Sequence, residues 1–467
     1  MKIRVQTRSA GSALLLALFT AFVICVALST YLYLVANQNQ SVLHSLSWNS
    51  SIPAVEAGVE EALTHLHYSG VANLVADGWG AIGSDGYSHK TGDLGNGYYF
   101  DVGVKPPAAG SPDVPTIDCI GYAPAPLNLA ASYSTPWGMM LGGLVPQFTP
   151  EKPATKRKVR VMAKRQTPVQ YAMLAKGQID LNGNNIGTDS FDSTDPSLST
   201  GGKYDPTKSR DKGDVATNSG IVNSVAVGNA DIRGHVSTGP GGSVDVGSNG
   251  SIGDKAWVTS NTGVEAGWVS DDTNVDIPDV QVPFTVPNAT AVLNAKYPPV
   301  TGPTYDIIVS SGNYKISDFH GKVLVLGAAK VAIDSSFNFN GSDGITISPG
   351  ASLEVYVSCA SASLGGNGIQ NPGDAMSFIY YGLKSNTSLS FAGNSSFTGT
   401  IYAPYADFKL GGSGSTTYDF VGASVSKTVT MTGHFNFHYD ESLARRFPIR
   451  EYVVFSWNEL NPNDTIN

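Results

Sequence analysis

One group of acidic side chains has the types and spacing of a metal site. Asp189, Asp192 and Asp195 recur every three residues in a stretch rich in Ser, Thr and Gly, and three more aspartates follow before residue 215. Carboxylate oxygens on a loop are ligands that calcium accepts. The spacing is not that of an EF-hand, so the sequence leaves open a calcium site or a solvated acidic loop. It predicts no other cofactor.

A second polar group lies near the C-terminus, where His434, His438, Asp440 and Glu441 are close in sequence. If this segment is a strand, the two histidines lie on one face, an arrangement that metals use. The alternative is a strand whose polar outer face closes the domain, with Phe435 and Phe437 in the core. The sequence favours this alternative.

Patterns for covalent or hydrolytic catalysis are missing from the sequence. No G-x-S-x-G motif occurs, and the adjacent pair Asp271 and Asp272 would point to opposite faces of a strand. Glycoside chemistry needs two carboxylates at a defined separation. We therefore expect no enzyme, and the alternative is a carbohydrate-binding or carbohydrate-active β-helix enzyme of the envelope.

The three cysteines suggest at most one disulfide. Cys25 lies in an apolar run, which leaves Cys119 and Cys359 as the pair that an oxidising compartment would permit. Sequence alone does not show that these two residues meet.

Composition favours an exported β-protein. Charged residues make up 14% of the chain, against about 25% in an average protein, and glycines number 52. The net charge of −9 argues against nucleic acid as a partner, because phosphate binding needs a basic face. The basic run 156–165 alternates with apolar residues, so we expect a strand with a solvated basic face.

The N-terminus predicts a single membrane span. Three basic residues precede an uncharged run at 12–35, which exceeds the roughly 20 residues that a helix needs to cross a bilayer. Tyr31 and Tyr33 mark the outer interface. We expect an inner-membrane anchor with the bulk of the chain periplasmic or at the cell surface. A cleaved signal peptide is the alternative.

Residues 169–443 carry short alternating apolar segments separated by Gly, Asn and Asp. Alternation with period 2 predicts strands, and the Gly-rich corners predict tight turns between them. Strands in tandem with such corners favour a right-handed parallel β-helix over a β-sandwich. A short helix is expected near 289–296.

The remaining segments complete the predicted organisation. Residues 1–70 form the basic leader, the transmembrane helix and its helical extension, and 71–168 form a small α+β stalk with strands at 98–104 and 158–163. The tail 444–467 is either a closing strand on the coil or an exposed segment for a partner. The fold class is therefore mainly β, with an N-terminal helix.

Two motifs in the first 70 residues resemble PilX-like type IV pilin accessory proteins. These motifs are RSAGSALLL at 8–16 and AVEAGVEEAL at 54–63. The resemblance implies prepilin-type processing between Gly11 and Ser12, a helix motif with Glu56, Gly58 and Glu60, and a partner in type IV pilus or secretion machinery. Processing there would place Leu16 where major pilins have a glutamate, which implies an accessory subunit.

The coil resembles bactofilin-like polymer-forming domains and the β-helical domains attached to PilX-like segments. The shared motifs are GNADIRGHVSTGPGG at 228–242, GTIYAP at 399–404 and the closing segment 420–443. The resemblance implies a display scaffold without catalytic residues. We expect a pilin-like surface protein for pilus assembly or adhesion, with the membrane and surface glycans as partners.

Overall fold

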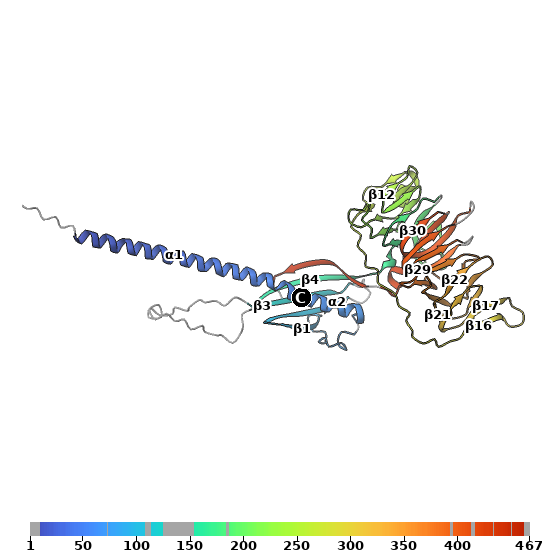
Figure 1. Ribbon diagram of the computed structural model, residues 1–467, viewed down its shortest axis with the longest axis horizontal. Helices are drawn as coiled ribbons and strands as arrows, with labels where there is room; N and C mark the ends of the chain where they lie inside the picture. The colour runs from blue at the N-terminus through green and yellow to red at the C-terminus, as the bar shows by residue number, and fades with distance from the viewer. Residues whose placement is uncertain are drawn as a thin grey trace, which may run out of the picture. The chain divides into compact units, whose positions relative to one another are not determined.

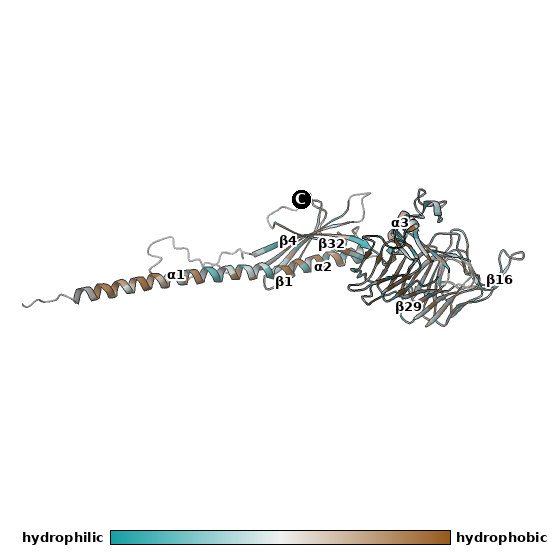
Figure 2. Ribbon diagram, turned by 90° about the horizontal axis from the view of Figure 1, so that it is seen from above, coloured by the Kyte–Doolittle hydropathy of each residue, from teal (hydrophilic) through white to brown (hydrophobic). Residues whose placement is uncertain are grey.

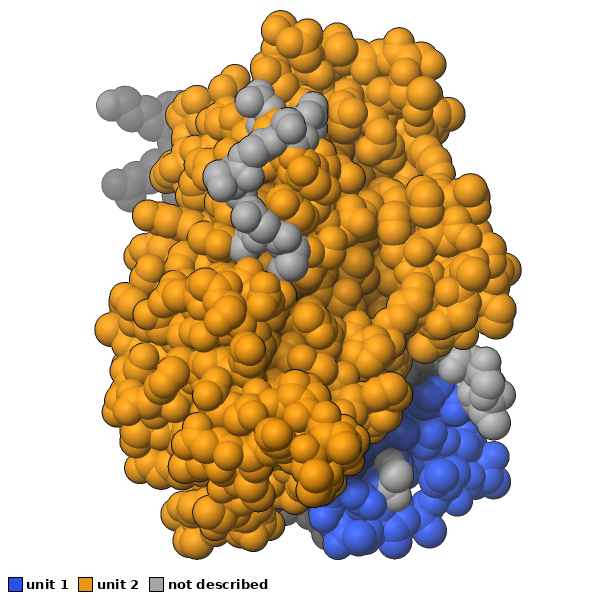
Figure 3. Space-filling view, turned by 90° about the vertical axis from the view of Figure 1, so that its right-hand side faces the viewer, with its two compact units in different colours: residues 1–165, 451–467 blue, residues 166–450 orange. Residues whose placement is uncertain are grey.

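The chain forms two compact units, which are described separately below. The computed structural model describes residues 10–71, 73–107, 114–124, 154–183, 186–392, 396–411, 416–432, 434–449 and 451–461. Unit 1 comprises Met1–Arg165 and Glu451–Asn467, and unit 2 comprises Gln166–Arg450. Figure 3 colours the two units blue and orange. Strand makes up 43% and helix 18%, which confirms a mainly β protein with large parallel sheets.

Two consecutive helices begin unit 1, α1 (Ala10–Ser50) and α2 (Ile52–Ser69). They separate at Ser51, just before Pro53, whose ring and missing N–H disfavour a continuous helix. Hydrophobic residues dominate the first half of α1 in Figure 2. The described chain has one stretch, Ala13–Ser69, that is long and apolar enough to cross a membrane.

A five-stranded sheet forms the rest of unit 1. In the order β1-β2-β3-β4-β32, its strands are β1 (Ser88–Gly95), β2 (Tyr98–Lys105), β3 (Thr116–Pro124), β4 (Ala154–Gln166) and β32 (Glu451–Leu460). The pairs from β1 to β4 are antiparallel. The predicted strands at 98–104 and 158–163 are present as parts of β2 and β4, and β3 lies between them.

The C-terminal tail closes this sheet rather than the coil. Strand β32 lies beside β4, and Arg157 donates to both carboxylate oxygens of Glu459 at 2.6 and 2.7 Å. Tyr452 is 4% exposed in the core between α2 and the sheet, and its backbone N–H donates to His67 Nε2 at 2.9 Å. The interpretation of the tail as a strand on the coil is therefore wrong, since β32, the red strand beside β4 in Figure 1, belongs to the unit in which the chain began. The interpretation as an exposed segment for a partner stays a prediction, because Val453, Phe455 and Trp457 are 40–50% exposed.

Unit 2 contains a 22-stranded sheet, with the parallel pairing of a β-helix, and a five-stranded sheet. The strands of the first half are β5 (Met173–Ala175), β6 (Ile179–Asp180), β7 (Gly187–Phe191), β8 (Val215–Thr217), β9 (Val225–Gly228), β10 (Asp231–Arg233), β11 (Val236–Ser237), β12 (Val244–Val246), β13 (Ser251–Gly253), β14 (Gly263–Val264) and β15 (Val269–Ser270). The short helices are η1 (Pro168–Gln170), η2 (Pro206–Lys208), α3 (Lys255–Ser260) and α4 (Leu443–Arg446).

The second half of unit 2 continues the coil. Its strands are β16 (Val292–Lys296), β17 (Thr304–Val309), β18 (Gly312–Lys315), β19 (Asp318–Phe319), β20 (Lys322–Val325), β21 (Ala328–Ile333), β22 (Ser336–Phe339), β23 (Gly344–Ile347), β24 (Ser352–Val357), β25 (Ser361–Leu364), β26 (Ile369–Gln370), β27 (Phe378–Gly382), β28 (Ser388–Phe391), β29 (Phe397–Leu410), β30 (Tyr418–Met431) and β31 (Phe435–Asp440). Residues 292–296 are strand β16, not the expected helix, because their backbone pairs antiparallel with β17.

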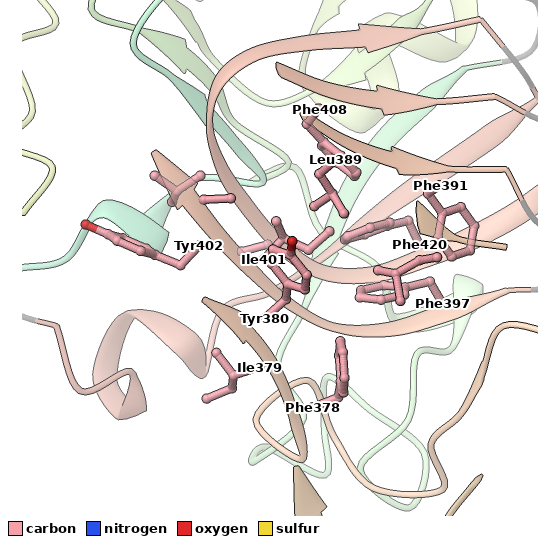
Figure 4. Close-up of a cluster of buried hydrophobic side chains, with 14 of the residues drawn as sticks. Phe378, Ile379, Tyr380, Leu389, Phe391, Phe397, Ile401, Tyr402, Phe408 and Phe420 are labelled. Atoms are coloured by element: carbon pink, nitrogen blue, oxygen red, sulfur yellow. The ribbon is translucent and has the colours of Figure 1, made fainter. Parts of the chain in front are cut away.

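In the middle of the coil each turn contributes three strands that pair with the next turn, whereas the long strands β29 and β30 each cover two faces. Strands β20, β21 and β22 pair in parallel with β23, β24 and β25. Alternate side chains point inward, which buries a column of aromatic rings, as Figure 4 shows for Phe391, Phe397 and Phe420. The rings of Phe397 and Phe420 stack at 4.4 Å, and this continuous core stabilises the short strands.

The order of the strands in the coil does not follow the order of the chain. The first strand of unit 2, β5, pairs in parallel with β8 on one side and with β30 on the other. The chain therefore enters in the middle of the coil and builds the turns β5–β15. It then builds the turns from β17 onward, which end against its own first turn. We call the boundary where β5, β6 and β7 pair with β30 and β31 the seam.

Candidate functional site

The seam brings together the two polar groups that the sequence presents separately. Strand β31 pairs in parallel with β7, so that His438 is opposite Asp189. Nδ1 of His438 lies 2.5 Å from Oδ1 of Asp189. Both side chains are buried, with 5% and 7% of their surface exposed. Parallel pairing thus brings residues of the predicted acidic loop and of the predicted closing strand into one buried cluster.

His438 has a carboxylate on each side of its ring. Its Nε2 lies 3.2 Å from Oδ1 of Asp419, and the ring of Tyr204 stacks on it with centroids 3.6 Å apart. Burial alone would lower the pKa of His438, but the hydrogen bonds to the two aspartates outweigh burial and raise that pKa above its ordinary value. The Tyr204 hydroxyl donates to Oδ2 of Asp189 at 2.6 Å. Both ring nitrogens of His438 therefore lie within hydrogen-bond distance of a carboxylate.

Asp192 and Asp195 point to other partners. Asp192 accepts from Arg445 at 2.6 Å and from the backbone and hydroxyl of Thr194. Despite partial burial, those hydrogen bonds lower the pKa of Asp192. Asp195 accepts from the backbone and hydroxyl of Ser197 at 2.8 and 2.6 Å. The three predicted calcium ligands therefore do not lie together around one point. The described residues contain no group of three or more His, Cys, Asp or Glu that could hold a metal.

Two further acidic residues complete the seam. Glu441 accepts from Ser190 at 2.9 Å and from Lys212 at 3.1 Å. Asp440 is fully buried, and one of its oxygens accepts from the backbone of Ser193 at 3.1 Å. Burial raises the pKa of Asp440, whose other oxygen has no hydrogen-bond partner in the described structure. These contacts join the first and last turns of the coil, and that is a structural role.

The glycine of the PilX-like helix motif lies against the sheet of unit 1. A Cβ built on Gly58 would be 2.5 Å from Sγ of Cys119 on β3. From the opposite side, a Cβ on Gly121 would be 2.6 Å from the backbone nitrogen of Val55. Helix α2 and strand β3 therefore approach each other closely at two glycines. Gly58 of the motif is needed at this contact because a larger side chain would not fit between the helix and the strand.

The other motif residues lie apart from this contact. Glu56 and Glu60 are exposed on α2, whereas the neighbouring Glu61 pairs with Lys90 of β1. Gly11 and Ser12, the predicted processing pair, fall on the first turn of α1, where side chains lie outside the described residues. Their processing stays a prediction.

The predicted disulfide does not form in this structure. Cys119 is buried in the core of unit 1 and Cys359 in the core of unit 2, and both are free thiols. Burial raises the pKa of each thiol, and it does so most strongly for Cys119.

One residue of the basic run is not solvated. Lys158 is fully buried, 3.9 Å from Oδ2 of Asp118, and Arg160 donates to both oxygens of the same carboxylate. The prediction of a solvated basic face is therefore wrong for Lys158. It is buried beside an acid on the next strand, which sequence spacing does not reveal.

Comparisons with known proteins add little to this geometry. Residues 293–446 match a family model described as a domain of unknown function (DUF7305). No curated protein matches the chain. Among solved structures, the chain is similar to the competence-associated pilin ComZ from Thermus thermophilus, with 9% identity over 89% of this chain and 98% of that chain, at a TM-score of 0.21.

A TM-score this low carries no argument about fold or function. Nor do the comparisons bear on the PilX-like and bactofilin-like resemblances, which stay predictions. The functional conclusion must come from the helix, the sheet and the coil themselves.

Proposed function

We propose that this chain is a single-pass inner-membrane protein of pilin-like build that displays a β-helix outside the membrane. The observation that carries the proposal is the continuity of unit 1. The apolar helix α1 leads at Ser51 into α2, which packs on an antiparallel sheet. Along α1 the large apolar side chains are exposed, for example Leu15 at 72% and Phe22 at 64%, a pattern that lipid would cover.

The finer proposal is a PilX-like accessory role in type IV pilus assembly or adhesion. Its support is the pair of N-terminal motifs and the packing of Gly58 on β3. Prepilin-type processing would leave Ser12 as the first residue of the mature chain. Mass spectrometry of the purified protein tests this, and an intact Met1 would leave only a membrane anchor.

A non-catalytic role fits the seam better than the alternative of a carbohydrate-active enzyme. In the seam, Asp189 and Asp192 accept from His438 and Arg445. Acid–base catalysis needs a carboxyl group that can reach substrate. We therefore propose that the β-helix acts by binding.

Membrane fractionation tests the anchor with a matched pair of double variants. Leu18→Asp/Val23→Asp places two charges inside the uncharged run. At the bilayer centre each charge raises the free energy of membrane insertion by about 3 kcal/mol. Leu43→Asp/Leu46→Asp places the same charges at exposed positions of α1 beyond that run. The first variant should leave the membrane fraction and the second should remain. Equal behaviour of the two would contradict the proposal.

A further inference from the structure

Two of the three faces of the coil in unit 2 differ in what covers them. On the face built by β27, β29, β30 and β5, the outward side chains Tyr381, Tyr402, Val425 and Leu174 are at most 3% exposed. Part of the cover is the segment 271–291, since the Tyr402 hydroxyl donates to the carbonyl of Pro278 at 2.7 Å. This face is closed.

The second face is open and polar. From turn to turn, one outward residue of each strand stands in register with the next, and we call this column the polar ladder. It consists of Asn338, Ser363, Ser390, Lys409, Thr430, Asp180, Ala226 and Asp245. All of these are exposed or half-buried, while the alternating residues, such as Leu389 and Phe408, are buried in the core.

A shorter column runs beside the polar ladder. Ser361, Ser388, Asp407 and Thr428 are in register on the same face. Lys427 lies 3.2 Å from the carboxylate of Asp407, which compensates its charge. The open face therefore presents two rows of mainly short hydroxyl and carboxyl side chains.

Spacing and charge define what this face can bind. Neighbouring strands lie about 4.8 Å apart, so the polar ladder repeats a hydrogen-bonding side chain at that interval, except at Ala226. A sugar unit in an extended β-linked chain has a similar length and carries several hydroxyl groups. Over the whole ladder Lys409 is the cation and Asp180 and Asp245 are the anions, so the net charge is only −1 and gives little attraction for a charged polymer.

We propose that the polar ladder binds an extended, uncharged polysaccharide whose axis runs along the coil, one sugar unit to each strand. Each hydrogen bond to a sugar hydroxyl is weak, because water competes for the same groups. A rigid row of such sites gains by binding one polymer at many points. This inference rests on the proposed function, since the β-helix must be displayed where such a polymer exists.

The test is co-sedimentation of the full chain, purified in detergent, with microcrystalline cellulose and with chitin, and with amylose as a coiled α-linked control. The wild type should sediment with at least one of the two extended polymers and not with amylose. Ser363→Arg/Ser390→Arg raises two long side chains from the flat face and should weaken binding by on the order of tenfold or more. Thr285→Arg, at an exposed position of the segment 271–291, should bind as the wild type does.

Two further variants keep the test decisive. Ser363→Thr/Ser390→Thr retains both hydroxyls and should keep binding. If the double arginine variant unfolds early by circular dichroism, Asn338→Arg at an exposed position of the ladder replaces it. The proposal is overturned if neither extended polymer sediments the wild type, if amylose does so equally, or if the arginine variants of the ladder bind like Thr285→Arg. Membrane fractionation of the expressing cells, before detergent is added, reports separately on the anchor.

Discussion

The imidazole of His438 lies 2.5 Å from the carboxylate of Asp189, although 249 residues separate them in the chain. This contact joins the last strand of the coil to its first turn. Because the pair is buried and ringed by Asp419 and Tyr204, it is the centre of the seam. The coil is thus held together where the chain enters and leaves it.

Removing one partner of this pair should destabilise the β-helix unit. Asp189→Asn or His438→Ala leaves a buried polar group without its partner, which costs about 3–5 kcal/mol in comparable pairs. Chemical denaturation of the full chain in detergent, followed by far-ultraviolet circular dichroism, measures the change. Asp245→Asn, at an exposed position of β12, is the control and should change stability by less than about 0.5 kcal/mol. An equal loss of unfolding free energy in the seam variants and in Asp245→Asn would show that the buried pair does not stabilise the β-helix unit.

The same pair predicts how stability depends on pH. Folding raises the pKa of His438, so its contribution is complete below the unfolded value of about 6.5 and is lost as pH rises through the higher folded value. We expect the melting temperature of the β-helix unit to fall from pH 6 to pH 8.5. His438→Gln should flatten this dependence, and a slope that survives the substitution would assign it to other groups.

Gly58→Ala should destabilise unit 1, although alanine usually stabilises a helix. The added Cβ would lie 2.5 Å from Sγ of Cys119, and overpacking of this kind costs about 1–3 kcal/mol. Removing the sulfur with Cys119→Ala should recover part of the loss in the double variant. Thermal melts of the four proteins measure the coupling. Additive effects would mean that the helix does not meet the sheet at this point.

Neither buried cysteine should react in the folded protein. Burial raises the pKa of the Cys119 thiol, so iodoacetamide should modify it only after denaturation. Mass spectrometry of native and denatured samples of a Cys25→Ser variant tests this. A Cys119–Cys359 disulfide in protein purified from the envelope would contradict the structure.

Local patterns predicted much of the fold. The short alternating segments predicted across 169–443 are found as strands with one buried face, for example Ser361–Leu364 and Ser388–Phe391. The predicted helical extension within residues 1–70 is likewise found as α2, whose buried Val55, Val59 and Leu66 pack on a sheet. These features depend on neighbours within a few residues, which the sequence shows directly.

Features that depend on distant segments could not be predicted. Nothing near Asp189 indicates that His438 faces it, since strand order is set by which turns stack. The tail at 451–460 has an ordinary strand pattern, but its partner β4 lies some 290 residues earlier. Lys158 resembles a surface lysine until Asp118 is placed beside it.

Protease accessibility in spheroplasts tests the central claim most directly. If the β-helix unit lies outside the membrane, protease added to intact spheroplasts removes it, while a cytoplasmic marker protein survives. A matched sample without protease should retain the full chain in the membrane fraction. The account is contradicted if the unit is cleaved only after lysis, or if the chain is recovered in the cytoplasmic fraction.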